Sequence, residues 1–477
     1  MKNINPATGK PWKILWFGDG VGLSGFGRIG NETCKRLKQR GYDVQMAVIN
    51  YSGWPHDFSI ANWIWPLAGQ DIWGGLVGIV NQIQPQPDLL ISCQDFPYHQ
   101  TIWQACRIDF SRVKWVWITP IDGEPLHPDW LKLCDFADGE MVISRFGVEA
   151  MRREGKRVEL CHPGVDTREF YPADEGERKT LREKAGYGPD DYVCGVACMN
   201  QGRKAISCMI EAFHEFARDK SNAKLYLDMD KASPAGWDIP NLLKQMRWTE
   251  DEQKRVKYRE DMFKADMTLF APLRARYALM DMHMVISHRE GFGLPLLETM
   301  ACHIPTMALD WCSGTEICGG GRGMLIKRLP YMEHGTWGGA KDAFPDMDDF
   351  VLKLNLLYQD PTRAAAIAEE GYRWAIQQTW DVTADQVEAV VQSALSRNRK
   401  DKPSHEPNAS AIPVILSDTY GRNGQRPDFP ATPEAADALG HHSELQQSPG
   451  ANQVPAIAGG DGADGGAGGT ITDSGTG

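Results

Sequence analysis

Short apolar runs, separated by stretches with helical periodicity, recur along the first 400 residues. Residues 13–17 form such a run; it ends at a glycine-rich stretch, and residues 32–39 then have the pattern of a helix. Later apolar runs, each expected to be a strand, cover residues 41–49, 88–92 and 114–118. Apolar strands that alternate with helices are typical of a parallel, doubly wound sheet. The pattern therefore predicts an α/β domain in the first third of the chain.

The same pattern starts again after Gly186. Strands are expected at residues 192–197, 224–227 and 284–287, with a helix at residues 206–217. The connecting segment reads His162-Pro163-Gly164-Val165-Asp166, with the Pro-Gly punctuation of an interdomain link. We expect two Rossmann-like domains at 1–160 and 161–380, a helix at 381–398 that packs back on the first domain, and an acidic Gly/Pro-rich tail at 399–477.

Composition narrows the class of protein. Apolar residues make up 42% of the 477 residues and charged residues 24%, as in ordinary globular proteins with large cores. The net charge is −12, and residues 401–477, with ten acids and three bases, carry −7 of it. This balance argues against a surface that binds nucleic acid along its whole extent. The tail has too few apolar residues to offset its chain entropy, so we expect it to be disordered.

Targeting and metal-binding signals are weak. No apolar run approaches the roughly 20 residues of a membrane-spanning helix, and residues 1–12 lack the apolar centre of a signal peptide. We therefore expect no transmembrane segment and a cytoplasmic location. The eleven cysteines include no CxxC pair, so reduced and mostly buried thiols are expected.

Residues 287–302 form the most informative stretch. They read Ser-His-Arg-Glu-Gly-Phe-Gly-Leu-Pro-Leu-Leu-Glu-Thr-Met-Ala-Cys: a strand ends in a polar turn, glycines allow close approach of the backbone to a ligand, and a helix begins at Leu294. Free N–H groups at a helix N-terminus attract anionic oxygens. Glu290 then lies at the carboxyl end of the strand, and Glu298 lies one turn into the helix. Two carboxylates there can accept hydrogen bonds from the hydroxyls of a sugar nucleotide.

At this motif the chain resembles the retaining glycosyltransferases of family 4 (group 1), whose hallmark is two glutamates separated by seven residues. The resemblance covers residues 14–395. It includes the glycine-rich first loop, the Pro-Ile-Asp-Gly-Glu-Pro-Leu segment at 120–126, the His-Pro-Gly-Val-Asp segment and the motif at 287–302. It implies the GT-B architecture, in which two Rossmann-like domains with parallel sheets face a cleft.

The resemblance also implies the roles of the motif residues. Glu290 would act at the transferred sugar, as a catalytic residue, and Glu298 would hold the ribose hydroxyls. The residues between them would line the donor site: Gly291, Phe292, Gly293 and Leu294. If the resemblance does not hold, both glutamates are solvated carboxylates at a helix end.

The first domain contributes a glycine-rich loop and an aspartate. By resemblance, Gly25 and Gly27 belong to a loop that closes over the donor phosphates and the acceptor; the alternative is a flexible strand-helix turn. Asp122 follows an apolar strand and should face the interdomain cleft. It is a candidate catalytic residue that accepts a hydroxyl proton, and the competing interpretation is a turn carboxylate that caps backbone N–H groups.

The diphosphate of a donor needs cations. Lys204 fits the lysine that the family places before the first helix of the second domain, but Met199 stands where an arginine is often found. Arg203 is positioned to take over, because its planar fork can bind phosphate oxygens bidentately. A charged surface turn is the alternative for both side chains.

No metal site or cofactor is expected. Asp228 and Asp230 resemble the paired aspartates with which other glycosyltransferases hold a metal, but GT-B enzymes generally use side chains and helix ends instead. We interpret the pair as a polar strand terminus. The expected co-substrate is a nucleotide-diphosphate sugar.

The sequence thus predicts a glycosyltransferase that moves a sugar, with retention of anomeric configuration, to an unidentified acceptor. Polysaccharide, lipid, protein and modified nucleobase stay open as acceptors, as does the oligomeric state. The alternatives are a sugar-nucleotide epimerase or phosphorylase on the same fold, or an inactive protein that binds sugar nucleotides.

Overall fold

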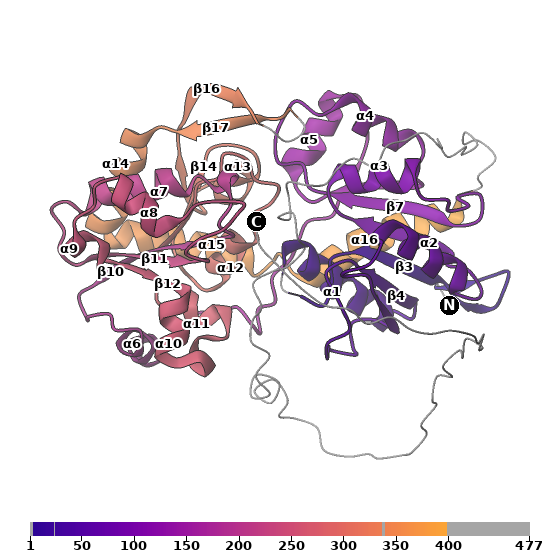
Figure 1. Cartoon of the computed structure of the whole chain (residues 1–477), viewed down its shortest axis with the longest axis horizontal. Helices are drawn as coiled ribbons and strands as arrows, with labels where there is room; N and C mark the ends of the chain where they lie inside the picture. The colour runs from indigo at the N-terminus through magenta and orange to yellow at the C-terminus, as the bar shows by residue number, and fades with distance from the viewer. Residues whose placement is uncertain (1–2, 23, 336–338, 398–477) are drawn as a thin grey trace, which may run out of the picture. The chain divides into compact units, whose positions relative to one another are not determined.

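The computed structural model describes residues 3–22, 24–335 and 339–397. The first sheet has the order β5 (Trp63–Pro66), β4 (Asp43–Val48), β3 (Lys13–Gly18), β6 (Leu89–Cys93), β7 (Lys114–Thr119), β8 (Gly139–Val142) and β9 (Glu159–Leu160), and all neighbouring strands are parallel (Figure 1). A short antiparallel pair, β1 (Ile4–Asn5) and β2 (Lys10–Pro11), precedes it. The predicted tail at 399–477 lies outside the described residues.

Helices cover both faces of the first sheet, which explains why its strands are apolar throughout. Ile14 and Trp16 of β3 pack on one face, with residues of α1 (Gly25–Gln39), whereas Leu15 and Phe17 pack on the other, with residues of α2 (Ile72–Gln82) and α3 (Phe96–Gln104). The remaining helices of this half are α4 (Pro128–Leu131), η1 (Lys132–Asp135) and α5 (Arg145–Arg153). A parallel strand buried on both faces has no polar face to show.

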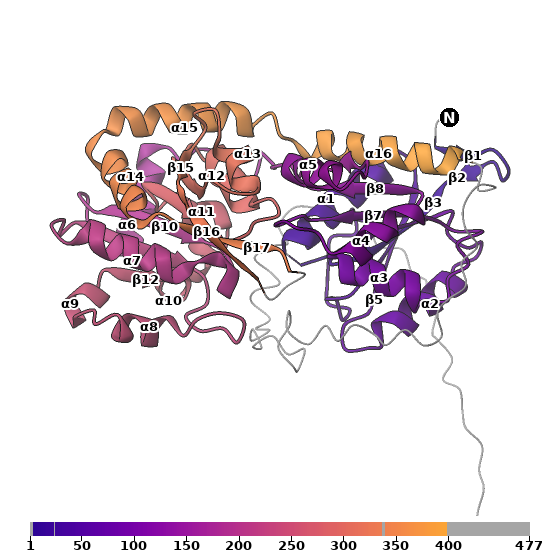
Figure 2. The same cartoon turned by 90° about the horizontal axis from the view of Figure 1, so that it is seen from above.

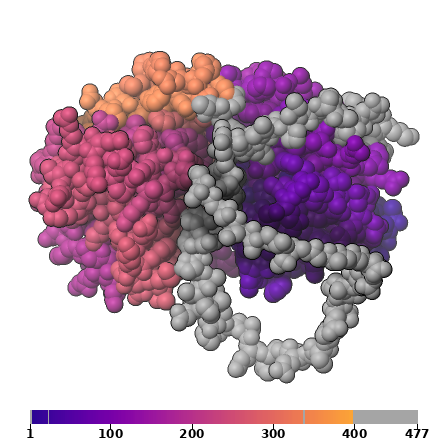
Figure 3. All heavy atoms as spheres, viewed as in Figure 1, coloured from indigo at the N-terminus to yellow at the C-terminus, as the bar shows by residue number. Residues whose placement is uncertain are grey.

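The second sheet is also parallel, in the order β12 (Val256–Tyr258), β11 (Ala223–Asp228), β10 (Tyr192–Ala197), β13 (Met282–Val285), β14 (Thr306–Leu309) and β15 (Met324–Ile326). Its helices are α6 (Glu175–Lys184), η2 (Gly202–Lys204), α7 (Ile206–Ala217), α8 (Ile239–Gln245), α9 (Glu250–Gln253), α10 (Arg259–Phe270), α11 (Leu273–Tyr277), α12 (Leu294–Ala301), α13 (Ser313–Cys318), α14 (Met347–Gln359) and α15 (Pro361–Ala375). In the space-filling view the indigo and violet residues of the first sheet and its helices form one continuous body of atoms, and the magenta to orange residues of the second sheet and its helices form another (Figure 3). The predicted α/β class with two parallel sheets is confirmed.

The last described helix, α16 (Trp380–Ser396), packs against α1, β7 and β8 of the first half, and Figure 2 shows it lying along that sheet. Its buried residues Val387, Val390 and Val391 belong to the same core as Ile14 of β3. A helix that follows the second domain in sequence therefore completes the core of the first.

Two predictions of local structure were wrong. The first helix begins at Gly25 and not near residue 32, because Ser24 caps it: the Gly27 amide donates to Ser24 Oγ at 3.0 Å. The glycines that suggested a longer loop lie inside the helix, where they allow close packing. A Cβ at Gly30 would stand 2.9 Å from the Asp19 carbonyl oxygen. The strand expected at 284–287 is β13, which begins and ends two residues earlier.

An antiparallel ribbon was not predicted at all. β16 (Arg328–His334) pairs with β17 (Lys341–Pro345) outside both parallel sheets. Most residues of β16 are exposed, among them Leu329 and Tyr331. A strand that is mostly exposed, as β16 is, leaves little hydrophobic pattern in the sequence.

Candidate functional site

Three aspartates follow three neighbouring strands of the first sheet. Asp19 comes directly after β3, Asp95 comes two residues after β6, and Asp122 comes three residues after β7. These strands are adjacent and parallel, so their carboxyl ends meet at one edge. Ligands of open α/β sheets bind at this edge. Asp19 is buried and accepts hydrogen bonds from Ser24 Oγ at 2.5 Å and Gln94 Nε2 at 3.1 Å.

The glycine-rich segment reaches the second domain through one of its two predicted glycines. A Cβ at Gly25 would stand 3.8 Å from Leu294 Cδ1, at the start of α12. Gly27, in the first turn of α1, packs instead against the loop before the helix, where a Cβ would stand 2.5 Å from the Gly22 carbonyl oxygen. Gly25 thus lies against the predicted donor site, and Gly27 is needed for the packing that holds the loop.

Glu290 is surrounded by cations. Lys204 Nζ donates to its Oε2, Arg203 Nη1 lies 3.7 Å from its Oε1, and Ser287 Oγ donates to Oε2 at 2.9 Å. Burial by itself would raise the pKa of this carboxyl, but the positive charges of Lys204 and then Arg203 lower the pKa of Glu290 to about 2. Glu290 and both predicted cations therefore form one ionised cluster, at the carboxyl ends of β10 and β13.

The residues between the two glutamates connect this cluster to the first domain. A Cβ at Gly291 would stand 2.7 Å from Pro120 Cβ, so a larger residue would collide with the segment that carries Asp122. Phe292 is buried and its ring lies 4.7 Å from that of His162. Gly293 precedes α12 with φ of +97°, a left-handed conformation that favours glycine, and Leu294 opens the helix.

Glu298 is buried in α12, and both of its carboxylate oxygens have partners. Arg28 of α1 donates to Oε1, and the hydroxyl of Tyr277 donates to Oε2 at 2.7 Å. The Arg28 guanidinium also lies 5.5 Å from the centre of the Phe170 ring. The residue predicted to hold the ribose is thus joined to the first domain by an ion pair across 270 positions of sequence. Its role toward a nucleotide stays a prediction.

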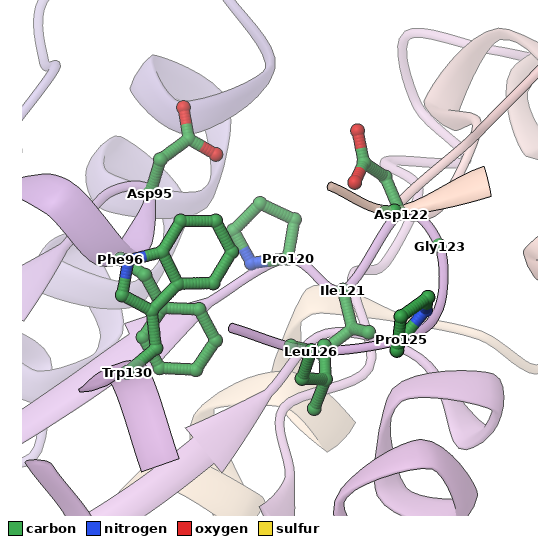
Figure 4. A pocket seen from close by; sticks show the side chains of 10 residues that line it. Asp95, Phe96, Pro120, Ile121, Asp122, Gly123, Pro125, Leu126 and Trp130 are labelled. Carbon is green, nitrogen blue, oxygen red and sulfur yellow. The ribbon is translucent and has the colours of Figure 1, made fainter. Parts of the chain in front are cut away.

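Asp122 lines a pocket together with Asp95 (Figure 4). The pocket is open to solvent, and its other walls include Phe96, Trp130 and Ala340. Asp122 Oδ1 lies 3.9 Å from Arg289 Nη1. None of the described hydrogen bonds has the Asp122 carboxylate as a cap of backbone N–H groups, the arrangement that the competing interpretation requires.

The Asp95 carboxyl differs from its neighbours. It is the first residue before α3 but makes no capping hydrogen bond, and within the described part of the chain it has no ion-pair partner. Burial, followed by the negative charge of Asp122, raises the pKa of Asp95 to about 7, with Arg203 acting in the opposite direction. Sequence reasoning missed this residue, although its position just past an apolar strand is the same signal that identified Asp122.

The paired aspartates at the end of β11, Asp228 and Asp230, form ion pairs with arginines. Asp228 is buried and accepts from Arg276 Nε at 3.1 Å through both oxygens, while Asp230 pairs with Arg259. Within residues 3–22, 24–335 and 339–397, no group of three or more His, Cys, Asp or Glu side chains is placed to hold a metal ion. In the same residues no helix has both the length and the hydropathy needed to span a membrane.

Met199, which stands where the family often has an arginine, lies at the surface. Met199 is 60% exposed, whereas Lys204 is buried. Arg203 Nη1 donates to the Arg289 carbonyl at 3.0 Å, which holds its guanidinium beside Glu290. Lys204 and Arg203 are thus fixed together at the predicted donor site.

Comparison with known proteins gives partial sequence matches. No model of a known protein family matches the chain. D-inositol 3-phosphate glycosyltransferase from Rhodococcus jostii (strain RHA1) is 26% identical over 251 residues, 52% of this chain and 49% of that protein. The protein of the same name from Thermobispora bispora is 26% identical over 265 residues, 54% of this chain and 55% of that protein. The chain spans about half the length of the curated relatives that it matches.

Solved structures match over more of the chain. Sucrose-phosphate synthase from Thermosynechococcus elongatus has a TM-score of 0.60 at 16% identity and covers 80% of this chain and 98% of its own. Anabaena HepE in complex with UDP and glucose has a TM-score of 0.57 at 17% identity, with 80% and 100% covered. WaaG, a glycosyltransferase involved in lipopolysaccharide biosynthesis, has a TM-score of 0.56 at 13% identity, with 79% and 98% covered. At these identities the likeness shows the fold alone.

Proposed function

We propose, from the premise that this chain is a family 4-like, group 1 glycosyltransferase with the GT-B fold, that it transfers a sugar from a nucleotide-diphosphate sugar to an acceptor. The observation that carries the proposal is the cluster of Glu290 with Lys204 and Arg203. An ionised carboxylate beside two cations can accept hydrogen bonds from sugar hydroxyls while the cations contact a diphosphate. These are the groups that binding and activation of such a donor require.

In the proposed reaction, Lys204 and Arg203 stabilise the charge that develops on the leaving diphosphate. Fixed cations in a partly buried site do this without reorganisation during the reaction. Glu290 orients the transferred sugar, and Glu298 accepts the ribose hydroxyls of the nucleotide. Arg28 and Tyr277 each donate to one oxygen of Glu298, and each oxygen can accept a second hydrogen bond from a ribose hydroxyl.

We propose that the acceptor enters from the first domain, beside Asp122. Asp122 would accept the proton of the attacking hydroxyl, and attack on the face that the diphosphate leaves would retain the anomeric configuration. Neither proton acceptance by Asp122 nor retention needs a metal in this proposal. The candidate metal ligands, Asp228 and Asp230, form ion pairs with Arg276 and Arg259. A cytoplasmic location stays a prediction of the sequence.

Two alternatives start from the same fold, an epimerase or phosphorylase and an inactive binding protein. Neither has a supporting contact of its own among the described residues. Incubation of a panel of donors with inorganic phosphate but without acceptor tests the first alternative, which isomerised or phosphorolysed sugar would favour. No nucleotide release with any donor and acceptor would favour the second.

Titration with a bare nucleoside diphosphate tests the donor site, and UDP is the first choice because HepE binds it. Glu298→Gln should weaken UDP binding by about 1.5–3 kcal/mol, the usual contribution of hydrogen bonds to a charged group. Arg28→Met is the matched control, since it breaks the same ion pair but keeps the carboxylate, and UDP should bind to it no more weakly than to the wild type. Wild-type affinity in Glu298→Gln would remove this residue from the donor site.

Glu290 gives the contrasting result if it acts on the transferred sugar. Glu290→Gln should lower kcat far more than it lowers affinity for UDP, because the sugar is absent from UDP. Equal losses of UDP affinity in Glu290→Gln and Glu298→Gln would contradict the division of roles.

A further inference from the structure

The pocket beside Asp122 is lined by two carboxylates and two aromatic rings. Figure 4 shows Asp95 and Asp122 on either side of Pro120, with the ring of Trp130 below Asp95. The Trp130 ring stacks on Phe96, with centroids 5.2 Å apart and planes 15° apart. This stack keeps the indole in place as one wall of the pocket. Trp130 is half-buried, so part of its surface is accessible.

The lining of the pocket contains no cation. Among the described residues that line it, Asp95 and Asp122 are charged, and none is Lys, Arg or His. Two guanidinium groups lie just outside the lining. Arg203 bonds the Arg289 carbonyl and lies beside Glu290, and Arg289 is shared between Asp342, to which its Nε donates at 2.5 Å, and Asp122, whose Oδ1 lies 3.9 Å from its Nη1. The three carboxylates of Asp95, Asp122 and Asp342 therefore outnumber the one cation nearest to the pocket, and the pocket is acidic.

These features select among acceptors by charge and shape. A phosphate monoester carries about −1.5 to −2 charges at neutral pH, so two carboxylates without a cation in the lining would repel it. The hydroxyls of a neutral ring, in contrast, are donors that carboxylate oxygens accept. An indole face can pack against the C–H groups of such a ring.

Resting on the proposed function, we infer that the pocket of Asp95, Asp122 and Trp130 binds the acceptor, and that this acceptor group is a neutral polyhydroxylated ring without a phosphate. Asp95 and Asp122 accept hydrogen bonds from its hydroxyls, and Trp130 packs against its face. The acceptor then differs in charge from the one in the name of the sequence relatives, D-inositol 3-phosphate glycosyltransferase.

The raised pKa of Asp95 agrees with this assignment. A carboxyl with a pKa of about 7 is protonated in part at neutral pH, so it can both donate to and accept from a hydroxyl. A phosphate could use such a group only in its protonated form.

Binding of paired probes to the full chain, saturated with UDP, tests the inference. The probes are myo-inositol against D-inositol 3-phosphate, and glucose against glucose 6-phosphate, measured by ligand-observed NMR. We expect each neutral probe to bind at least about tenfold more tightly than its phosphate. At pH 8, where Asp95 is mostly ionised, Asp95→Asn should reduce this preference about tenfold, because it removes one negative charge. Trp130→Ala should weaken both members of a pair alike.

The control is Asp129→Asn, which removes one negative charge next to Trp130 from a side chain that does not line the pocket. It should keep the wild-type preference, and all the variants should bind UDP normally, which shows that they are folded. A phosphate probe that binds as tightly as its neutral partner would overturn the inference. Selection for a positively charged ring, with glucosamine bound more than about tenfold more tightly than glucose, would also overturn the inference.

The remaining outcomes separate the two proposals. If no neutral probe binds at millimolar concentration while UDP does, the inference fails and the donor site stands. If neither UDP nor another nucleoside diphosphate binds to the wild type, the proposed function fails.

Discussion

The carboxylates on the two sides of the site are held in opposite ways. On the second domain, Glu290 is paired with Lys204, and Glu298 is paired with Arg28. On the first domain, Asp95 has no ion pair within the described residues, and Asp122 has only a cation at 3.9 Å. A buried carboxylate with a cation stays ionised, whereas a desolvated one without a cation takes up a proton more readily. The pKa of Glu290 is accordingly lowered to about 2, and the pKa of Asp95 is raised to about 7.

The difference in ion pairing suits the two sides of the proposed site to different ligands. On the donor side, Lys204 and Arg203 already lie beside one anion, the Glu290 carboxylate. These fixed cations can also stabilise the negative charge of a diphosphate. The weakly paired carboxyls on the acceptor side, Asp95 and Asp122, suit neutral hydroxyls. The variants below test whether this difference in pairing is real.

The largest effect is expected from Lys204→Met. It leaves the buried Glu290 with Arg203 as its only near cation, so the free energy of unfolding should fall by about 3 kcal/mol. Urea unfolding measures it. The double variant Lys204→Met/Glu290→Gln should recover most of the loss, because the uncompensated charge is gone. A double variant as unstable as the single one would mean that the pair is not coupled.

Removal of the Asp95 charge should raise the free energy of unfolding, whereas Lys204→Met should lower it. Because the folded state raises the pKa of this carboxyl from 3.8 to about 7, the folded protein binds more protons than the unfolded chain between these values. The wild type should therefore lose stability as pH rises from about 4 to about 7. Asp95→Asn should remove this loss and gain about 2 kcal/mol at pH 8, less than the full conversion of the shift because the residue is partly exposed.

Unfolding at pH 4 and pH 8 gives the difference between Asp95→Asn and the wild type at each pH. Asp129→Asn, on the exposed side of α4, should show no gain at pH 8. An Asp95→Asn variant with the same pH dependence as the wild type would show that the carboxyl titrates normally.

A smaller effect is expected from Tyr277→Phe. The buried hydroxyl donates to Glu298 at 2.7 Å, so its removal should cost about 1–2 kcal/mol of stability. Tyr331→Phe is the control, because this exposed hydroxyl also bonds a glutamate, Glu333, at 2.8 Å and should contribute almost nothing. Equal effects of the two variants would argue against a special environment of Glu298.

The smallest effect is expected from a chelator. If Lys204 and Arg203 provide the positive charge at the diphosphate, turnover with EDTA should stay within about twofold of that without it. Loss of turnover with EDTA and its recovery with manganese would return Asp228 and Asp230 to consideration as metal ligands.

Much of the fold could be predicted because its signals are local. Residues 192–197 and 206–217 form β10 and α7 as expected, since a buried parallel strand and the helix after it each carry a continuous pattern. The fold implied by the motif at 287–302 is confirmed by the solved glycosyltransferase structures. The start of α1 was misplaced because glycines that pack closely in a helix look like glycines of a loop.

The sequence by itself determined that Glu290 follows a strand and that Glu298 lies in the next helix, because both positions depend on neighbours within a few residues. Only the tertiary structure decided what these side chains contact. Arg28 meets Glu298 from 270 positions away, and Asp95 meets Asp122 because β6 and β7 are neighbours in the sheet. Strand order and long-range ion pairs depend on how the cores pack, and no local pattern of apolar and polar residues records them.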